Sequence, residues 1–153
     1  MPGSVTSMSP PDALPDALPD PLPQPAPDAV RRWHAVVDCA DPARRSALLS
    51  DLLADDVVFR SPAVHRPQEG RALSTAYLEA AMVVLGPTLT YERELVTGDS
   101  ACLEFRADLG GVVVHGVDLL RWNEDGRLVD FTVMVRPMKG LQALVERMAE
   151  QLR

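Results

Sequence analysis

The segment GVDLLRWNEDGRLVDFTVMVRP (residues 116–137) contains the strongest local structural signal in this chain of 153 residues. Its Asn-Glu-Asp-Gly run, at 123–126, favours a tight turn, because Asn, Asp and Gly tolerate the backbone angles that hairpin turns need. The apolar residues on both sides favour extended chain. The segment therefore predicts an antiparallel hairpin with strands over 112–122 and 128–136.

Alternating polar and apolar residues continue on the N-terminal side of this hairpin. They predict two more antiparallel strands, over about 89–95 and 101–109. In the first of these strands, Tyr91 and Leu95 are expected on the apolar face of the sheet. Glu94 is expected among the charged residues of the outer face.

Between residue 28 and the first long strand, and again at the C-terminus, most apolar residues recur at the three- and four-residue intervals of a helix. Asp41-Pro42 favours a helix start, since aspartate is a good N-cap and proline is tolerated in the first turn. Four helices are predicted, over about 28–40, from 42 to 53, over about 71–85 and from 137 to 152, with a short strand at 57–59. These elements predict an α+β domain whose helices cover one face of a curved antiparallel sheet.

Residues 1–27 differ in composition from the rest of the chain. They hold nine of the 14 prolines and no Lys or Arg. Proline lacks the amide donor and restricts φ, so neither helix nor sheet can propagate there. We interpret 1–27 as a disordered, partly polyproline-II tail, with a ligand for a proline-binding module as the alternative. The domain is predicted over 28–153.

Charge and composition exclude several classes of partner. The formal net charge is −7 and there is no basic block, so neither nucleic acid nor an anionic membrane is an expected partner. No apolar run reaches the roughly 18–20 residues that cross a bilayer. Cys39 and Cys102 are expected to be buried free thiols. Because the N-terminus shows no secretory signal, a cytoplasmic location is expected.

Asp118 is the principal candidate for a functional group. It shares a strand face with Val114 and Leu120, so a single carboxylate projects from an apolar stripe. In an apolar pocket, desolvation raises the pKa of such a carboxyl, which lets it act as an acid or as a hydrogen-bond donor. The alternative is a carboxylate that is paired structurally with an arginine or with backbone amides.

The histidines and glycines form no known site pattern. The three histidines share no metal-ligand spacing and no phosphate-binding glycine loop occurs, so neither a metal nor a cofactor is expected. His65, in the loop after the short strand, is either a ligand contact or a solvated loop histidine. His115 alternates to the strand face opposite Asp118, where it is expected to meet solvent or a partner subunit.

Three segments carry a resemblance to a known family: LADDVVFRSP (53–62), EGRALSTAYL (69–78) and the hairpin segment 116–137. In order and spacing they resemble the NTF2-like superfamily, and within it the SnoaL-like branch. The resemblance implies a cone-shaped fold around an apolar pocket for a small apolar molecule, and a homodimer formed through the outer face of the sheet. Its members include ketosteroid isomerases, polyketide cyclases, epoxide hydrolases and proteins without known activity. The fold is therefore implied more strongly than the chemistry.

The acid–base residues that this resemblance implies are only partly present. Steroid isomerases of this fold carry a base aspartate just after the first strand, where this chain has Ser61, and a tyrosine roughly at Val37. Their second, protonated aspartate matches Asp118. Cyclases and epoxide hydrolases carry an aspartate in the last strand, near Val133. Because a serine hydroxyl is too weak a base to abstract a carbon-bound proton unaided, ordinary ketosteroid isomerisation is not expected.

Two functions remain open at this stage, and the sequence does not decide whether the chain is an enzyme. The first is binding of a small apolar molecule with a carbonyl or hydroxyl group, with cofactor-free isomerase, cyclase or dehydratase chemistry. Asp118 would be the acid or polarising group, assisted by His65 or Ser61. The pocket would be lined by Trp33, Val37, Tyr77, Val114, Leu120, Trp122 and Val133, with core packing as the alternative for the aromatic residues. The second is a non-catalytic dimerisation or interaction domain; a cavity of about 300 Å³ or more would favour the first.

Overall fold

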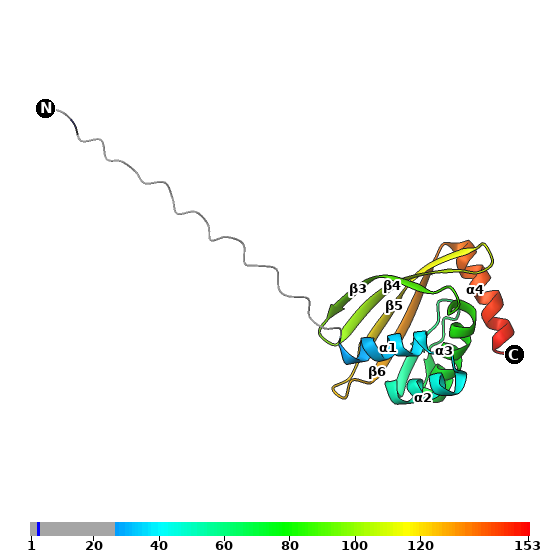
Figure 1. Cartoon of the computed structure of the whole chain (residues 1–153), viewed down its shortest axis with the longest axis horizontal. Coiled ribbons are helices and arrows are strands. Elements are labelled where there is room, and N and C mark those ends of the chain that lie inside the picture. Colours follow the sequence, from blue (N-terminus) through cyan, green and yellow to red (C-terminus); the bar gives the residue numbers. More distant parts are fainter. Residues whose placement is uncertain (1–2, 4–26) are drawn as a thin grey trace.

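A computed structural model of the chain describes Gly3 and residues 27–153. The predicted disordered tail falls almost entirely outside the described residues. The elements, in chain order, are α1 (Asp28–Asp38), α2 (Pro42–Leu52), β1 (Leu53–Arg60), β2 (Gln68–Glu69), α3 (Arg71–Leu85), β3 (Thr90–Thr97), β4 (Ser100–Asp108), β5 (Val113–Trp122), β6 (Leu128–Arg136) and α4 (Met138–Gln151). Helices α1, α2 and α3 gather on one side of the sheet, and α4 lies at its far end (Figure 1). The predicted α+β class is confirmed.

The six strands form one mixed sheet in the order β2-β1-β6-β5-β4-β3. Strands β3 to β6 pair with their chain neighbours antiparallel, as the turn signals predict. Strand β1, however, pairs parallel to β6, so the sheet is not wholly antiparallel as expected. A parallel pair needs a long crossover connection, and here α3 and four strands, β2 to β5, lie between the two partners.

Strand β1 is longer than the sequence predicts, and it begins directly after α2. Leu53, expected to end the preceding helix, instead pairs with Leu128 of β6. The strand starts four residues before the predicted span of 57–59 and ends one residue after it, at Arg60. Leu53 has helical spacing relative to the other leucines, but pairing with β6 overrides this local preference.

A β-bulge in β3 reverses the faces that were expected for its second half. Glu92 and Arg93 together oppose the single residue Glu104 of β4. Beyond this point Leu95 lies on the outer face, where it is 65% exposed, and Glu94 lies on the side of the helices, where it contacts α1. The expected positions of Leu95 and Glu94 are therefore wrong, because a bulge shifts the two-residue alternation by one position.

Two apolar clusters fill the space between the helices and the inner face of the sheet. The larger cluster joins α1, α2 and α3 to the sheet and includes Trp33, Leu103 and Phe131. The smaller cluster lies under α4 and includes Phe105 and Leu144. The cavity described below borders on both clusters.

Two further expectations concern the cysteine thiols and membrane-spanning helices. Cys39 and Cys102 are free, as predicted, but they are half-buried and not fully buried. Within the described part of the chain, no helix has the length and apolar character needed to cross a bilayer.

Candidate functional site

An apolar cavity of about 170 Å³ lies between the inner face of the sheet and helices α1, α3 and α4. Its walls include Phe59, Met82, Phe105, Phe131 and Leu144. The volume is below the 300 Å³ that marks the lower end of sites for drug-sized ligands, so the cavity size that would favour ligand binding in the sequence analysis is not reached. An apolar cavity of about 150 Å³ can hold benzene, so this cavity matches a single six-membered ring.

The structure brings half of the predicted site residues to this cavity. Trp33, Ser61, Tyr77, Asp118 and Val133 line it, whereas Val37, His65, Val114, Leu120 and Trp122 lie outside its lining. Val114 and Leu120 are buried in the apolar clusters, and His65 is exposed. Strand alternation identifies inward-facing side chains, but only the packing of the helices decides which of them reach the cavity.

Asp118 reaches the cavity from the middle of β5 and is only 5% exposed. The hydroxyl of Tyr91, on β3, donates a hydrogen bond to Asp118 Oδ2 at 2.6 Å. The indole N–H of Trp33, on α1, donates to the Tyr91 oxygen at 2.7 Å. Asp118 is thus bonded to a tyrosine, and no arginine or backbone amide of the described residues pairs with it.

Tyr91 is a site residue that was not predicted from the sequence. Tyr91 and Asp118 lie 27 positions apart, on strands that are separated by β4. The one available signal was a tyrosine at an inward-facing strand position, since a buried hydroxyl needs a hydrogen-bond partner.

The pKa values of both groups are shifted by their surroundings. Burial raises the pKa of Asp118 to about 7, and the hydrogen bond from Tyr91 opposes part of this rise. Burial, and then the charge of Asp118, raise the pKa of Tyr91 well above its ordinary value, so its hydroxyl keeps its proton at neutral pH. A carboxyl that titrates near neutrality can both donate and accept a proton under physiological conditions.

Ser61 and His65 do not join Asp118 in a catalytic cluster. Ser61 lies in the cavity wall, but its hydroxyl accepts a hydrogen bond from the backbone N–H of Ala63 at 3.1 Å. Among the described residues, no hydrogen bond links Ser61 or His65 to Asp118. The carboxyl of Asp118 is the one carboxyl group in the cavity lining.

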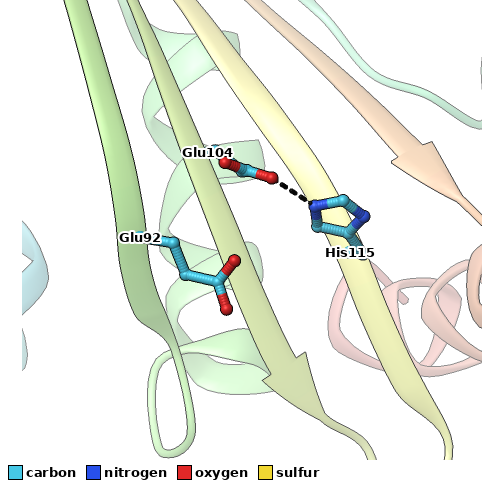
Figure 2. Close-up of side chains that lie close together, drawn as sticks. All are labelled: Glu92, Glu104 and His115. Atoms are coloured by element: carbon cyan, nitrogen blue, oxygen red, sulfur yellow. Dashed lines mark hydrogen bonds and ion pairs between the residues drawn. The ribbon is translucent and has the colours of Figure 1, made fainter.

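A second group of titratable side chains lies on the opposite, outer face of the sheet. Glu92, Glu104 and His115, from three neighbouring strands, place three metal-ligand atoms within 4.8 Å of one another (Figure 2). His115 Nε2 donates to Glu104 at 2.8 Å. Arg93 pairs with Glu104, and Arg106 pairs with Glu92 at 2.7 Å. A metal would have to displace both guanidinium groups, so these residues are better described as an ion-pair network.

Comparison with known proteins establishes the family. The model of the SnoaL-like domain family matches residues 30–131, from α1 to β6. The chain therefore belongs to the SnoaL-like domain family, and its fold is the NTF2-like fold that the sequence resemblance implies. A comparison with curated protein sequences gave no match.

Several crystal structures are similar to this chain. A steroid delta-isomerase from Pseudomonas aeruginosa is 41% identical over 81% of this chain and 88% of its own, with a TM-score of 0.73. An uncharacterized protein with a cystatin-like fold from Silicibacter pomeroyi is 31% identical over 82% of this chain and 85% of its own, also with a TM-score of 0.73. An NTF2-like protein of unknown function from Mesorhizobium loti, 23% identical over 72% of this chain and 89% of its own, shares the fold with a TM-score of 0.59.

Proposed function

We propose that this protein binds a small apolar molecule, about the size of one six-membered ring, that carries a carbonyl or hydroxyl group. The observation that carries this proposal is the position of Asp118 as the single carboxyl group in the wall of an otherwise apolar cavity. Apolar walls favour binding by about 25 cal/mol per Å² of apolar surface removed from water. One polar group among such walls fixes the orientation of the ligand.

Any reaction in this cavity would be a cofactor-free proton transfer of the isomerase, cyclase or dehydratase type. Asp118 would supply the acid, because a pKa near neutrality suits proton transfer in either direction. The similarity to a steroid delta-isomerase supports a ligand with a carbonyl group. However, Ser61 occupies the position after β1 where a carboxylate base would be needed, and a four-ring substrate would extend beyond this cavity. We therefore do not propose steroid isomerisation.

The test is a thermal-shift panel of cyclic ketones, small phenols, terpenoid epoxides and steroids against the wild-type protein and Asp118→Asn. We expect ring-sized ketones or phenols to raise the Tm of the wild type. The wild type should lose roughly tenfold in affinity for a ketone between pH 5.5 and pH 8, the effect of losing one donated hydrogen bond of about 1.4 kcal/mol. Asp118→Asn, whose amide keeps a donor and does not titrate, should bind the ketone equally at both pH values.

The matched control is Asp56→Asn, which changes an exposed carboxylate on β1 and should leave binding unchanged. Equal ligand affinity of Asp118→Asn and the wild type between pH 5 and pH 8 would contradict the role of Asp118. Binding of no ring-sized compound by the wild type would contradict the proposal as a whole.

The outer face of the sheet supports a second function, formation of a homodimer. Leu95 and Met134 are 65% and 55% exposed on this face. They border a shallow groove that also includes Cys102 and Val117. Exposed apolar side chains of this kind mark protein-interaction surfaces. We propose that two copies associate through this face, which leaves the cavity on the other side of the sheet free.

A further inference from the structure

The hydrogen bonds from Trp33 through Tyr91 to Asp118 can run in only one direction. An indole N–H donates and cannot accept, so the Tyr91 oxygen must accept from Trp33. The Tyr91 hydroxyl has one proton, and it donates this proton to Asp118 Oδ2. Trp33 thereby determines that Oδ2 is an acceptor.

The second oxygen of Asp118 has a different environment. In the described part of the chain, every fully buried side-chain nitrogen or oxygen has a hydrogen-bond partner, and no such bond reaches Asp118 Oδ1. Oδ1 is therefore not fully buried. Since Asp118 lines the cavity, Oδ1 is the oxygen that faces it.

We infer that Trp33 and Tyr91 are positioning residues, which together keep the acidic proton of Asp118 on Oδ1, the oxygen that faces the cavity. Oδ2 already accepts from Tyr91, so a proton on Oδ2 would collide with the tyrosine hydroxyl proton. When Asp118 is protonated, it therefore donates into the cavity, and the preferred ligand atom is a hydrogen-bond acceptor. The ligand preference rests on the function proposed above, but the position of the proton does not.

Few other titratable or charged groups face this chain of hydrogen bonds. Helix α1 contributes His34 and β3 contributes Glu94, whose side chains contact each other, with the His34 ring edge-on to Tyr91 at 5.1 Å between centroids. Helix α3 contributes the phenol of Tyr77 to the cavity wall. The cross-strand neighbours of Asp118 on β4 and β6 are the apolar side chains Leu103 and Val133. A pH-dependent change in an NMR signal is therefore assigned to Asp118 if it disappears in Asp118→Asn and persists in the control variant His34→Gln.

The first test is a pH titration of the ligand-free wild-type protein, followed by NMR. The ¹³C signal of the Asp118 carboxyl, assigned by its loss in Asp118→Asn, is followed against pH together with the indole N–H proton of Trp33. We expect both signals to titrate with one midpoint near pH 7, because the indole senses Asp118 through Tyr91. In Tyr91→Phe the indole response should disappear. An indole signal that does not follow Asp118 in the wild type would overturn the inference.

The second test is a double-mutant cycle on the midpoint of the Asp118 titration. Tyr91→Phe removes the bond to the carboxylate and should raise the midpoint by about one pH unit or more. Trp33→Phe should raise it by less, because the freed Tyr91 hydroxyl can turn and accept from protonated Asp118. In the Tyr91→Phe background, Trp33→Phe should have no further effect. An equal shift in both backgrounds would show a general packing effect and contradict the inference.

A third test measures ligand preference at pH 5.5, with cyclohexanone as an acceptor and cyclohexane as a matched apolar ring. The wild type should favour the ketone, and Trp33→Phe should reduce the ratio of ketone affinity to cyclohexane affinity several-fold. Only this ratio is compared, because Trp33 also lines the cavity and its replacement changes the binding of both rings. If neither compound binds, the proposed function fails and the titration tests still decide the position of the proton. If Trp33→Phe does not fold, the wild-type and Tyr91→Phe indole titrations decide it alone.

Discussion

Asp118 is an ionisable group in surroundings that disfavour its charge. Its cross-strand neighbours are apolar and its one hydrogen bond among the described residues comes from Tyr91. A single hydrogen bond cannot replace the hydration that a carboxylate loses on burial. Burial therefore raises the pKa of Asp118 to about 7, so the carboxyl is largely protonated in mildly acidic solution. The same desolvation that destabilises the carboxylate makes the residue useful as an acid.

This shift predicts how stability depends on pH. The folded pKa of Asp118, about 7, lies above the ordinary value of 3.8, so the folded state binds more protons than the unfolded state between these limits. The contribution of this residue to the free energy of unfolding is therefore complete below about pH 4 and is lost as the pH rises through 7. The loss approaches about 1.4 kcal/mol per pH unit at most.

Urea unfolding of the wild type and Asp118→Asn at several pH values between 4.5 and 8 tests this prediction. Because the variant lacks the titrating group, its stability relative to the wild type should increase as the pH rises. A constant difference between the two proteins would show that Asp118 titrates normally in the folded state.

At the scale of a single element, the bulge in β3 decides which residues face the site. Before it, Tyr91 lies on the inner face, opposite Phe105, and can reach Asp118. After it, Leu95 lies on the outer face. Without the extra residue, strict alternation would place Tyr91 and Leu95 on the same face.

Two substitutions to alanine test the bulge. Leu95→Ala changes a side chain that is exposed in the single subunit, so in dilute, monomeric protein it should alter the free energy of unfolding by no more than about 0.5 kcal/mol. Leu103→Ala, in the neighbouring strand, removes a side chain that is 0% exposed and should cost about 2–5 kcal/mol. Chemical denaturation measures both. Similar large losses for the two variants would mean that Leu95 is part of the core and that the bulge is absent.

At the scale of the whole molecule, α4 completes the wall of the cavity. Leu144 and Met148 of this helix line the cavity, while most of the helix surface remains accessible. A Cβ atom on Gly140 would lie 2.9 Å from the carbonyl oxygen of Val113, so the absence of a side chain lets α4 begin close to β5. The cavity thus depends on an element that follows the sheet in the chain and packs back against it.

Charged substitutions on the outer face of the sheet test the proposed homodimer. The double variant Leu95→Glu/Met134→Glu should dissociate a dimer of the 16.7 kDa chain, because it buries two charges in the contact. Sedimentation velocity should show the wild type near twice the chain mass, and the double variant near the chain mass. Met138→Glu, which changes an 84% exposed residue outside this face, is the control and should remain dimeric. A monomeric wild type would contradict the proposal.

The sequence by itself determined the features that neighbouring residues control. The turn at 123–126, the start of α2 at Asp41-Pro42 and the inward direction of Asp118 all follow from local turn, capping and alternation rules. Only the tertiary structure decided that Tyr91 bonds Asp118, that β3 contains a bulge and that the cavity is about 170 Å³. Local rules act over a few residues, whereas these features depend on how strands and helices distant in the chain pack together.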